Sequence, residues 1–125
     1  MTRDETIIRD VQAAQIPQTA LIKTLELEPE TGSTSVSLKN FKKIKDSPLD
    51  FTCIKIVFNF DKHPKLQTEW LGSRQKLTWD FSGFNAGYSG EGPHGLMKIL
   101  KTLGYTKWDM NMISGLENGT YEILK

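Results

Sequence analysis

Little in the composition marks this chain as a specialised protein. It has one cysteine and no run of about 18 apolar residues, which argues against a disulfide framework and against a membrane-spanning helix. The chain also has no excess of charge of one sign, because its 16 Lys and Arg nearly balance its 15 Asp and Glu and the formal net charge is +1. Such a balance gives no general attraction to nucleic acid or to anionic membranes. We therefore expect one globular domain over residues 1–125, with neither nucleic acid nor a membrane as its partner.

The single cysteine and the N-terminus both bear on the compartment. Residues 1–5 lack the apolar stretch of a signal peptide, and a lone cysteine fits a reducing environment, so we expect a cytoplasmic protein. Cys53 lies in a strand-like run, where a small buried thiol is ordinary. A catalytic thiol would need a basic partner, and neither His63 nor His94 is near it in sequence. A structural thiol is favoured, and a nucleophile remains the alternative.

Alternating apolar and polar residues predict four strands before residue 82. The alternation is partial in Thr19–Glu28 and Ser35–Phe41 and clear in Phe51–Phe60 and Gln75–Phe81. The last two strands supply the expected core residues, which are Ile54, Ile56, Phe58, Phe60, Leu77, Trp79 and Phe81. Several strands without long helices between them indicate an antiparallel meander.

Helical spacing of apolar residues predicts a helix toward each end of the chain. Asp4–Gln15 fits a short amphipathic helix, and a second helix starts at Pro93 and ends at the glycine cap Gly104. A hairpin-type turn at Asn118–Gly119 then leads into a strand-like C-terminus. The expected fold class is α+β: an antiparallel β-meander with a C-terminal helix packed on one face and a short N-terminal helix.

The stretch between the last clear strand and the C-terminal helix holds half of the chain's ten glycines. They are Gly83, Gly87, Gly90, Gly92 and Gly95. Glycines that lead into a helix let free N–H groups and the helix dipole converge on one point, as in phosphate and carboxylate sites. Pro93 removes one of these donors, and Glu91 would repel an anion unless it points away. A ligand-binding turn and a purely structural turn therefore both remain open.

If the turn binds a ligand, the sequence indicates which residues form the site. Backbone amides and a hydroxyl would bind the anion, an aromatic ring would stack on the ligand, and a cation would neutralise it. The candidate residues are Arg74, Phe84, Gly87, Tyr88, Ser89, Gly90, Gly92, His94 and Gly95. No nucleophile elbow, paired metal ligands or other catalytic motif is present, so binding is favoured over catalysis, with no metal and no cofactor. An enzyme whose site is assembled from distant parts of the chain remains the alternative.

Gly87–Leu96 resembles the pattern Gly-Tyr-x-Gly-x-Gly-Pro-x-x-Leu of short uncharacterised bacterial and phage proteins. In length and layout the chain also resembles phage anti-defence sponge proteins, which sequester nucleotide signals between subunits. The glycine-rich loop predicts non-catalytic capture of a phosphorylated, nucleotide-like small molecule, and the likeness implies that this ligand is a nucleotide signal. A domain this small, with edge strands, is expected to form a homodimer or higher homo-oligomer. The alternative is a protein–protein module, such as an immunity, antitoxin or inhibitor protein, with Tyr88 and a tryptophan as anchors.

A basic run precedes the clearest strand. Four lysines, with Phe41 and Ile44 interleaved, lie in the predicted second strand and just after it; they are Lys39, Lys42, Lys43 and Lys45. Lysines of this kind protect exposed strand edges, so a solvated edge is favoured over a nucleic-acid surface.

Overall fold

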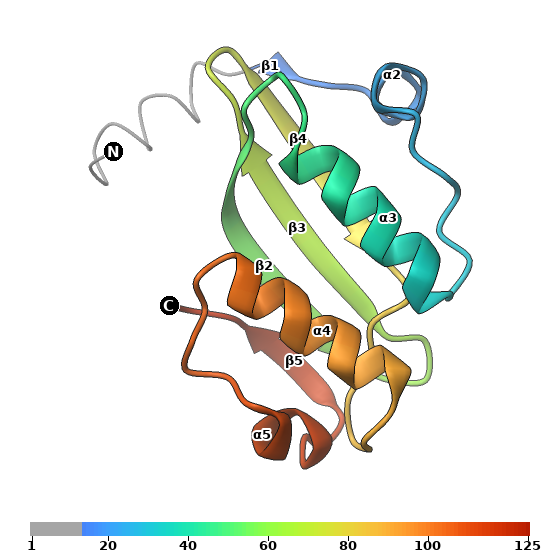
Figure 1. Cartoon of the computed structure of the whole chain (residues 1–125), viewed down its shortest axis with the longest axis vertical. Coiled ribbons are helices and arrows are strands. Elements are labelled where there is room, and N and C mark those ends of the chain that lie inside the picture. Colours follow the sequence, from blue (N-terminus) through green and yellow to red (C-terminus); the bar gives the residue numbers. More distant parts are fainter. Residues whose placement is uncertain (1–13) are drawn as a thin grey trace.

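The computed structural model describes residues 14–125 (Figure 1). Its elements are β1 (Ala14–Gln15), α2 (Gln18–Leu25), α3 (Thr34–Lys45), β2 (Thr52–Phe60), β3 (Lys65–Leu71), β4 (Gln75–Phe81), α4 (Glu91–Thr102), α5 (Met110–Ser114) and β5 (Gly119–Glu122). Most of the N-terminal helix predicted over Asp4–Gln15 lies outside the described residues. Its last two residues form β1, a strand, so the prediction is wrong there.

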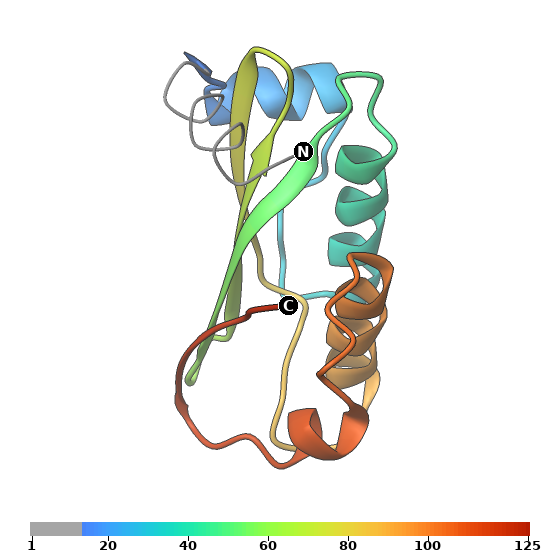
Figure 2. The same ribbon diagram turned by 90° about the vertical axis from the view of Figure 1, so that its left-hand side faces the viewer.

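The strands form one five-stranded sheet in the order β1-β4-β3-β2-β5. β2, β3 and β4 make an antiparallel meander, β5 returns to pair antiparallel with β2, and β1 pairs parallel with β4. α3 and α4 cover the same face of this sheet (Figure 2). The expected α+β class, with a C-terminal helix on one face of a meander, is therefore confirmed.

The two clear strand predictions are confirmed as β2 and β4. In β4, Leu77, Trp79 and Phe81 are buried as expected. β2 departs from strict alternation because a bulge lies between Cys53 and Lys55, which turns Cys53 into the core and leaves Ile54 only partly buried.

The strands predicted over Thr19–Glu28 and Ser35–Phe41 are wrong, since these segments form α2 and α3. In α3 the buried residues recur every three or four positions rather than every second one; they are Thr34, Ser37, Asn40, Phe41 and Ile44. Several of these buried residues are polar, so the pattern of hydrophobic residues does not show the helical period. The Ser33 side chain caps the helix by accepting a hydrogen bond from the Val36 amide at 3.4 Å.

The helix predicted from Pro93 to the Gly104 cap is confirmed as α4. Gly104 has φ +88°, and its amide donates to the Lys101 carbonyl while the Tyr105 amide donates to the Leu100 carbonyl. This pair of bonds is a Schellman motif, which satisfies carbonyls at the helix end. The strand predicted near the C-terminus is also present, but β5 pairs with β2 across the sheet rather than closing a local hairpin.

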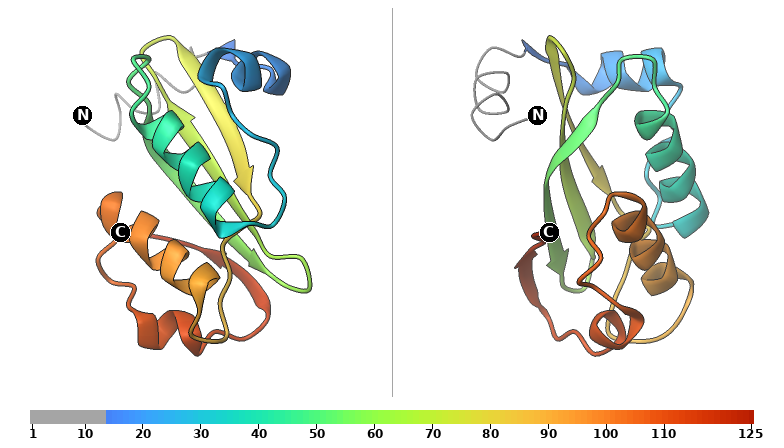
Figure 3. Two further views of the ribbon diagram at one scale, coloured as in Figure 1. Left: turned by 45° about the vertical axis from the view of Figure 1, so that its right-hand side comes forward. Right: turned by 60° about the vertical axis from the view of Figure 1, so that its left-hand side comes forward.

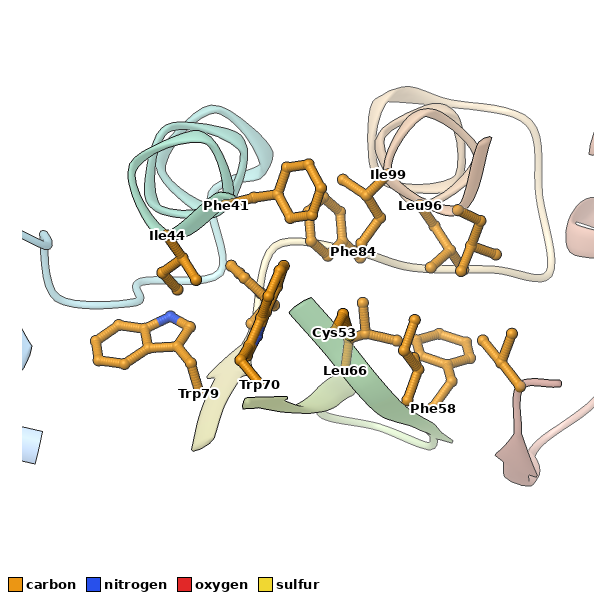
Figure 4. Packing of buried hydrophobic residues seen from close by; sticks show 14 of the residues in the cluster. Phe41, Ile44, Cys53, Phe58, Leu66, Trp70, Trp79, Phe84, Leu96 and Ile99 are labelled. Carbon is orange, nitrogen blue, oxygen red and sulfur yellow. The ribbon is translucent and has the colours of Figure 1, made fainter. Parts of the chain in front are cut away.

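The hydrophobic core fills the space between the two helices and the sheet (Figure 4). Phe41 of α3 packs on Trp70 of β3 with ring centroids 5.9 Å apart, and Phe84 packs on Phe81 at 5.5 Å. Leu96 and Ile99 of α4 are fully buried in the same cluster. α3 and α4 are therefore held side by side on the sheet by one continuous core.

Candidate functional site

The first glycine of the predicted binding loop has a packing role. A Cβ on Gly83 would lie 2.2 Å from the Ser33 carbonyl oxygen, so the close approach of β4 to α3 requires glycine. The Gly83 amide donates to Ser37 Oγ at 2.9 Å, and the Gly83 carbonyl accepts from Thr34 Oγ1 at 2.6 Å. Both backbone groups of Gly83 are thus used inside the protein.

Gly87 makes the turn itself. It has φ +81°, and a Cβ would lie 2.8 Å from the ring of Phe60. Its amide donates to the Ile113 carbonyl at 3.0 Å, which ties the loop to α5. This amide is not free to bind a ligand.

The remaining glycines make room for neighbouring side chains at the start of α4. A Cβ on Gly90 would lie 2.5 Å from the Tyr88 ring, and one on Gly92 would lie 2.8 Å from Asn85 Cβ. Gly95 faces α3, where a Cβ would lie 2.7 Å from Thr34 Cγ2. The five glycines therefore all have a packing reason, as expected for a structural turn.

Of the polar candidates, His94 is engaged locally. Its amide and its Nδ1 atom both contact the Gly90 carbonyl, at 3.0 and 2.7 Å. Tyr88 is 49% exposed, but its ring lies against the backbone of Gly90. Ser89 is exposed beside it. The hypothesis that this turn binds a phosphorylated ligand stays a prediction, with Tyr88 and Ser89 as its accessible part.

Two predicted site residues lie elsewhere. Phe84 is 1% exposed and packs in the core, so its ring has no open face for stacking on a ligand. Arg74 lies in the hairpin between β3 and β4, whereas the glycine-rich turn follows the opposite end of β4 (Figure 1). A seven-residue strand separates them by about 20 Å, so they do not meet within one chain.

Among residues 14–125, neither histidine lies beside the buried thiol of Cys53. Burial raises the pKa of the Cys53 thiol to about 12, and its Sγ lies 3.8 Å from the Lys55 carbonyl oxygen. His63 follows the far end of β2, and His94 lies at the start of α4. This supports the structural interpretation of Cys53.

We expect Cys53 in the folded protein to react very slowly with Ellman's reagent at pH 8, because the protonated thiol is shielded from solvent. Its full reaction in guanidinium chloride is the control. Rapid labelling of the native protein would contradict this assignment.

A different feature emerges where α3 and α4 lie side by side (Figure 3). The helices approach closely at Thr34 and Gly95, near their first turns, and a hollow of about 450 Å³ opens farther along them. We call it the basic groove; it is lined by Leu38, Lys39, Phe41, Lys42, Lys45, Asp46, Lys98, Ile99 and Thr102. Its floor is apolar and its rims carry lysines.

The charge of the basic groove is nearly uncompensated. It contains four lysines and one carboxylate, Asp46, which lies 3.8 Å from Lys45 Nζ. Within residues 14–125, no carboxylate forms an ion pair with Lys39, Lys42 or Lys98. The lining therefore carries a formal charge of +3, from +4 and −1, and the rest of the chain carries −2 to give the total of +1.

Sequence reasoning found the lysines of this site but assigned them the wrong structure. Lys39, Lys42 and Lys45 lie at helical spacing on one face of α3, not along a strand edge. The additional lysine, Lys98, comes from α4, more than fifty residues later in the chain. Only the packing of the two helices brings it to the same groove.

Comparison with known proteins gives no match to a family model, a curated protein or a solved structure. Across the part of the chain that the structure describes, no three His, Cys, Asp or Glu side chains are placed to hold a metal ion. None of the helices in residues 14–125 has the length and apolar character needed to cross a bilayer. The function must therefore be argued from the geometry of the surface.

Proposed function

We propose that the protein is a binding module that recognises an acidic protein partner through the basic groove. The observation that carries the proposal is the gathering of four lysines from two helices around one apolar hollow. Unpaired like charges repel one another, and an anionic partner relieves that repulsion while also being steered to the site.

The apolar floor favours a protein over a nucleic acid. Leu38 is the partly exposed apolar side chain of the lining, whereas Ile99 is fully buried beneath it. Phe41 is only 6% exposed, so no aromatic face is available for a base to stack on. The lining also contains no arginine, the residue that most often reads phosphates and bases in pairs of hydrogen bonds. A partner that combines carboxylates with apolar side chains matches both the rims and the floor.

This proposal develops the protein–protein alternative of the sequence analysis on a different surface. The sequence analysis expected the partner to contact the glycine-rich loop around Tyr88. In the structure, positive charge and apolar surface occur together in the basic groove instead. Nucleotide capture by the glycine-rich turn and assembly into a homodimer both stay predictions.

We expect reversal of two groove charges to abolish most of the binding. In Lys42→Glu/Lys98→Glu, two attractions become repulsions on opposite rims, which should weaken the affinity roughly tenfold or more, because each exposed pair contributes about 0.2–1 kcal/mol. The partner is captured from cells that carry the protein, purified and titrated by calorimetry against each variant.

The matched control is Lys62→Glu/Lys107→Glu, which makes the same charge change at two exposed lysines outside the groove. It should keep the affinity within about twofold, a change of less than about 0.5 kcal/mol. Recovery of a basic partner, or equal loss of binding in both double variants, would contradict the proposal.

A further inference from the structure

The shape of the groove says which kind of segment enters it. We propose that the occupant is an amphipathic α-helix of the partner, with an apolar stripe on the groove floor and carboxylates on both flanks. This inference rests on the proposed function, because it names the form that the acidic partner takes in the same groove.

The walls of the groove give few main-chain partners to an extended segment. Both walls are α-helices, in which only the last turn leaves carbonyl groups without partners inside the helix. Some of these carbonyls are also used, because the Asp46 amide donates to the Lys42 carbonyl and the Tyr105 amide donates to the Leu100 carbonyl. A strand laid over the apolar floor would therefore leave most of its own backbone groups without partners. A helix satisfies its backbone internally, so it can enter the groove and contribute only side chains.

The dimensions of the walls fit a short helix. On α3, Leu38 and Lys45 are seven positions apart, or about 10 Å along the axis, with Lys42 between them. On α4, Lys98 and Thr102 are about one turn apart. A partner helix of two to three turns covers this length. Its apolar residues would fall at positions i, i+4 and i+7 to face the partly exposed Leu38 and the methylene stems of the flanking lysines.

The two rims carry different numbers of charges, which gives the helix a sidedness. The α3 rim holds Lys39, Lys42 and Lys45 with Asp46 beside Lys45, a net charge of +2, whereas the α4 rim holds Lys98, a charge of +1. We therefore infer that the partner helix has more carboxylates on the flank that faces α3 than on the flank that faces α4.

The test uses synthetic, fluorescently labelled peptides of about 18 residues, or about five turns. The first has leucines at i, i+4 and i+7 with glutamates on both flanks. The second has the same composition with the leucines dispersed around the helix, and the third is the first peptide with a central proline. Fluorescence anisotropy measures binding to the wild type, to Lys42→Glu/Lys98→Glu and to Lys62→Glu/Lys107→Glu.

The first peptide should bind the wild type about tenfold more tightly than either of the others, and its helical circular dichroism should increase on binding. That preference should disappear in Lys42→Glu/Lys98→Glu and persist in Lys62→Glu/Lys107→Glu. Equal binding of all three peptides, still dependent on the groove lysines, would overturn the helical occupant but leave the acidic partner in place.

Two other outcomes would overturn both proposals. One is the absence of groove-dependent binding by any peptide, measured on variants whose melting temperatures match the wild type. The other is groove-dependent binding of a DNA or RNA oligonucleotide, with the acidic peptides failing to compete for it.

Discussion

Replacement of Gly83 by alanine is expected to destabilise the fold by about 3–5 kcal/mol, or to prevent folding. The added Cβ would lie 2.2 Å from the Ser33 carbonyl oxygen and 2.6 Å from Ser37 Oγ, and backbone cannot move aside cheaply. Overpacking of this kind costs about 1–3 kcal/mol, and the two hydrogen bonds of Gly83 would add about 1 kcal/mol each. Chemical denaturation measures the loss.

Gly119→Ala is the matched control for this substitution. Its added Cβ would meet only the Tyr121 ring at 3.6 Å, an ordinary contact, and Gly119 needs no positive φ. The control should change the stability by less than about 1 kcal/mol. Similar stabilities for Gly83→Ala and Gly119→Ala would show that β4 and α3 do not approach as closely as described.

Replacement of Glu30 by glutamine is expected to cost about 2–4 kcal/mol. The Glu30 carboxylate accepts four hydrogen bonds, from Ser37 Oγ, Asn40 Nδ2, Trp79 Nε1 and the Ser82 amide, at 2.5–3.1 Å. Each of its oxygens accepts two of them, so an amide NH₂ would face the Asn40 and Trp79 donors in one position and the Ser82 amide in the other. Donors left without an acceptor cost about 1–3 kcal/mol each when buried.

The Glu30 network matters for the proposed site because it fixes α3, one wall of the basic groove, to the end of β4. Glu117→Gln is its control, since the Glu117 side chain is exposed and only its carbonyl is engaged, by Tyr121 Oη. We expect thermal unfolding of Glu30→Gln about 10 °C below that of the control. Coincident melting curves would rule out a structural role for the carboxylate.

The sequence correctly predicted the strands and helices whose buried residues are the apolar ones. β4 alternates apolar and polar side chains, and α4 combines apolar residues at helical spacing with proline in its first turn and glycine after its last. In both elements, the spacing of apolar residues in the sequence equals the spacing of buried residues in the structure. β4 is an inner strand of the sheet, and α4 is one wall of the groove.

α3 shows why the other predictions failed. Ser37 and Asn40 are fully buried, because Ser37 bonds to Glu30 and Gly83 while Asn40 bonds to the backbone of Glu28. These hydrogen-bond partners are brought to α3 only by the folding of the chain. The sequence therefore shows polar residues at positions that the structure buries, and the helical spacing of the buried face could not be recognised. The chance alternation of Val36 and Leu38 then indicated a strand.

The basic groove could be predicted only in part from the sequence, for a similar reason. The lysines of α3 lie close together in sequence, but the groove they line also needs Lys98 from α4, which only the packing of the two helices brings to them. The glycine-rich turn was conspicuous because five glycines lie close together in sequence. A side chain at any of these positions would clash with a neighbouring residue, and a local sequence pattern does not show such contacts. The neighbours are Ser33, Phe60, Tyr88, Asn85 and Thr34.

The most direct test of the basic groove is a map of the bound surface by NMR. ¹⁵N-labelled protein is titrated with the acidic amphipathic peptide, and the amide shifts of the folded chain are followed. We predict saturable shifts centred on Lys39, Lys42 and Lys98, which vanish in Lys42→Glu/Lys98→Glu. Shifts centred instead on Tyr88 and Ser89, or on the open face of the sheet, would contradict the assignment.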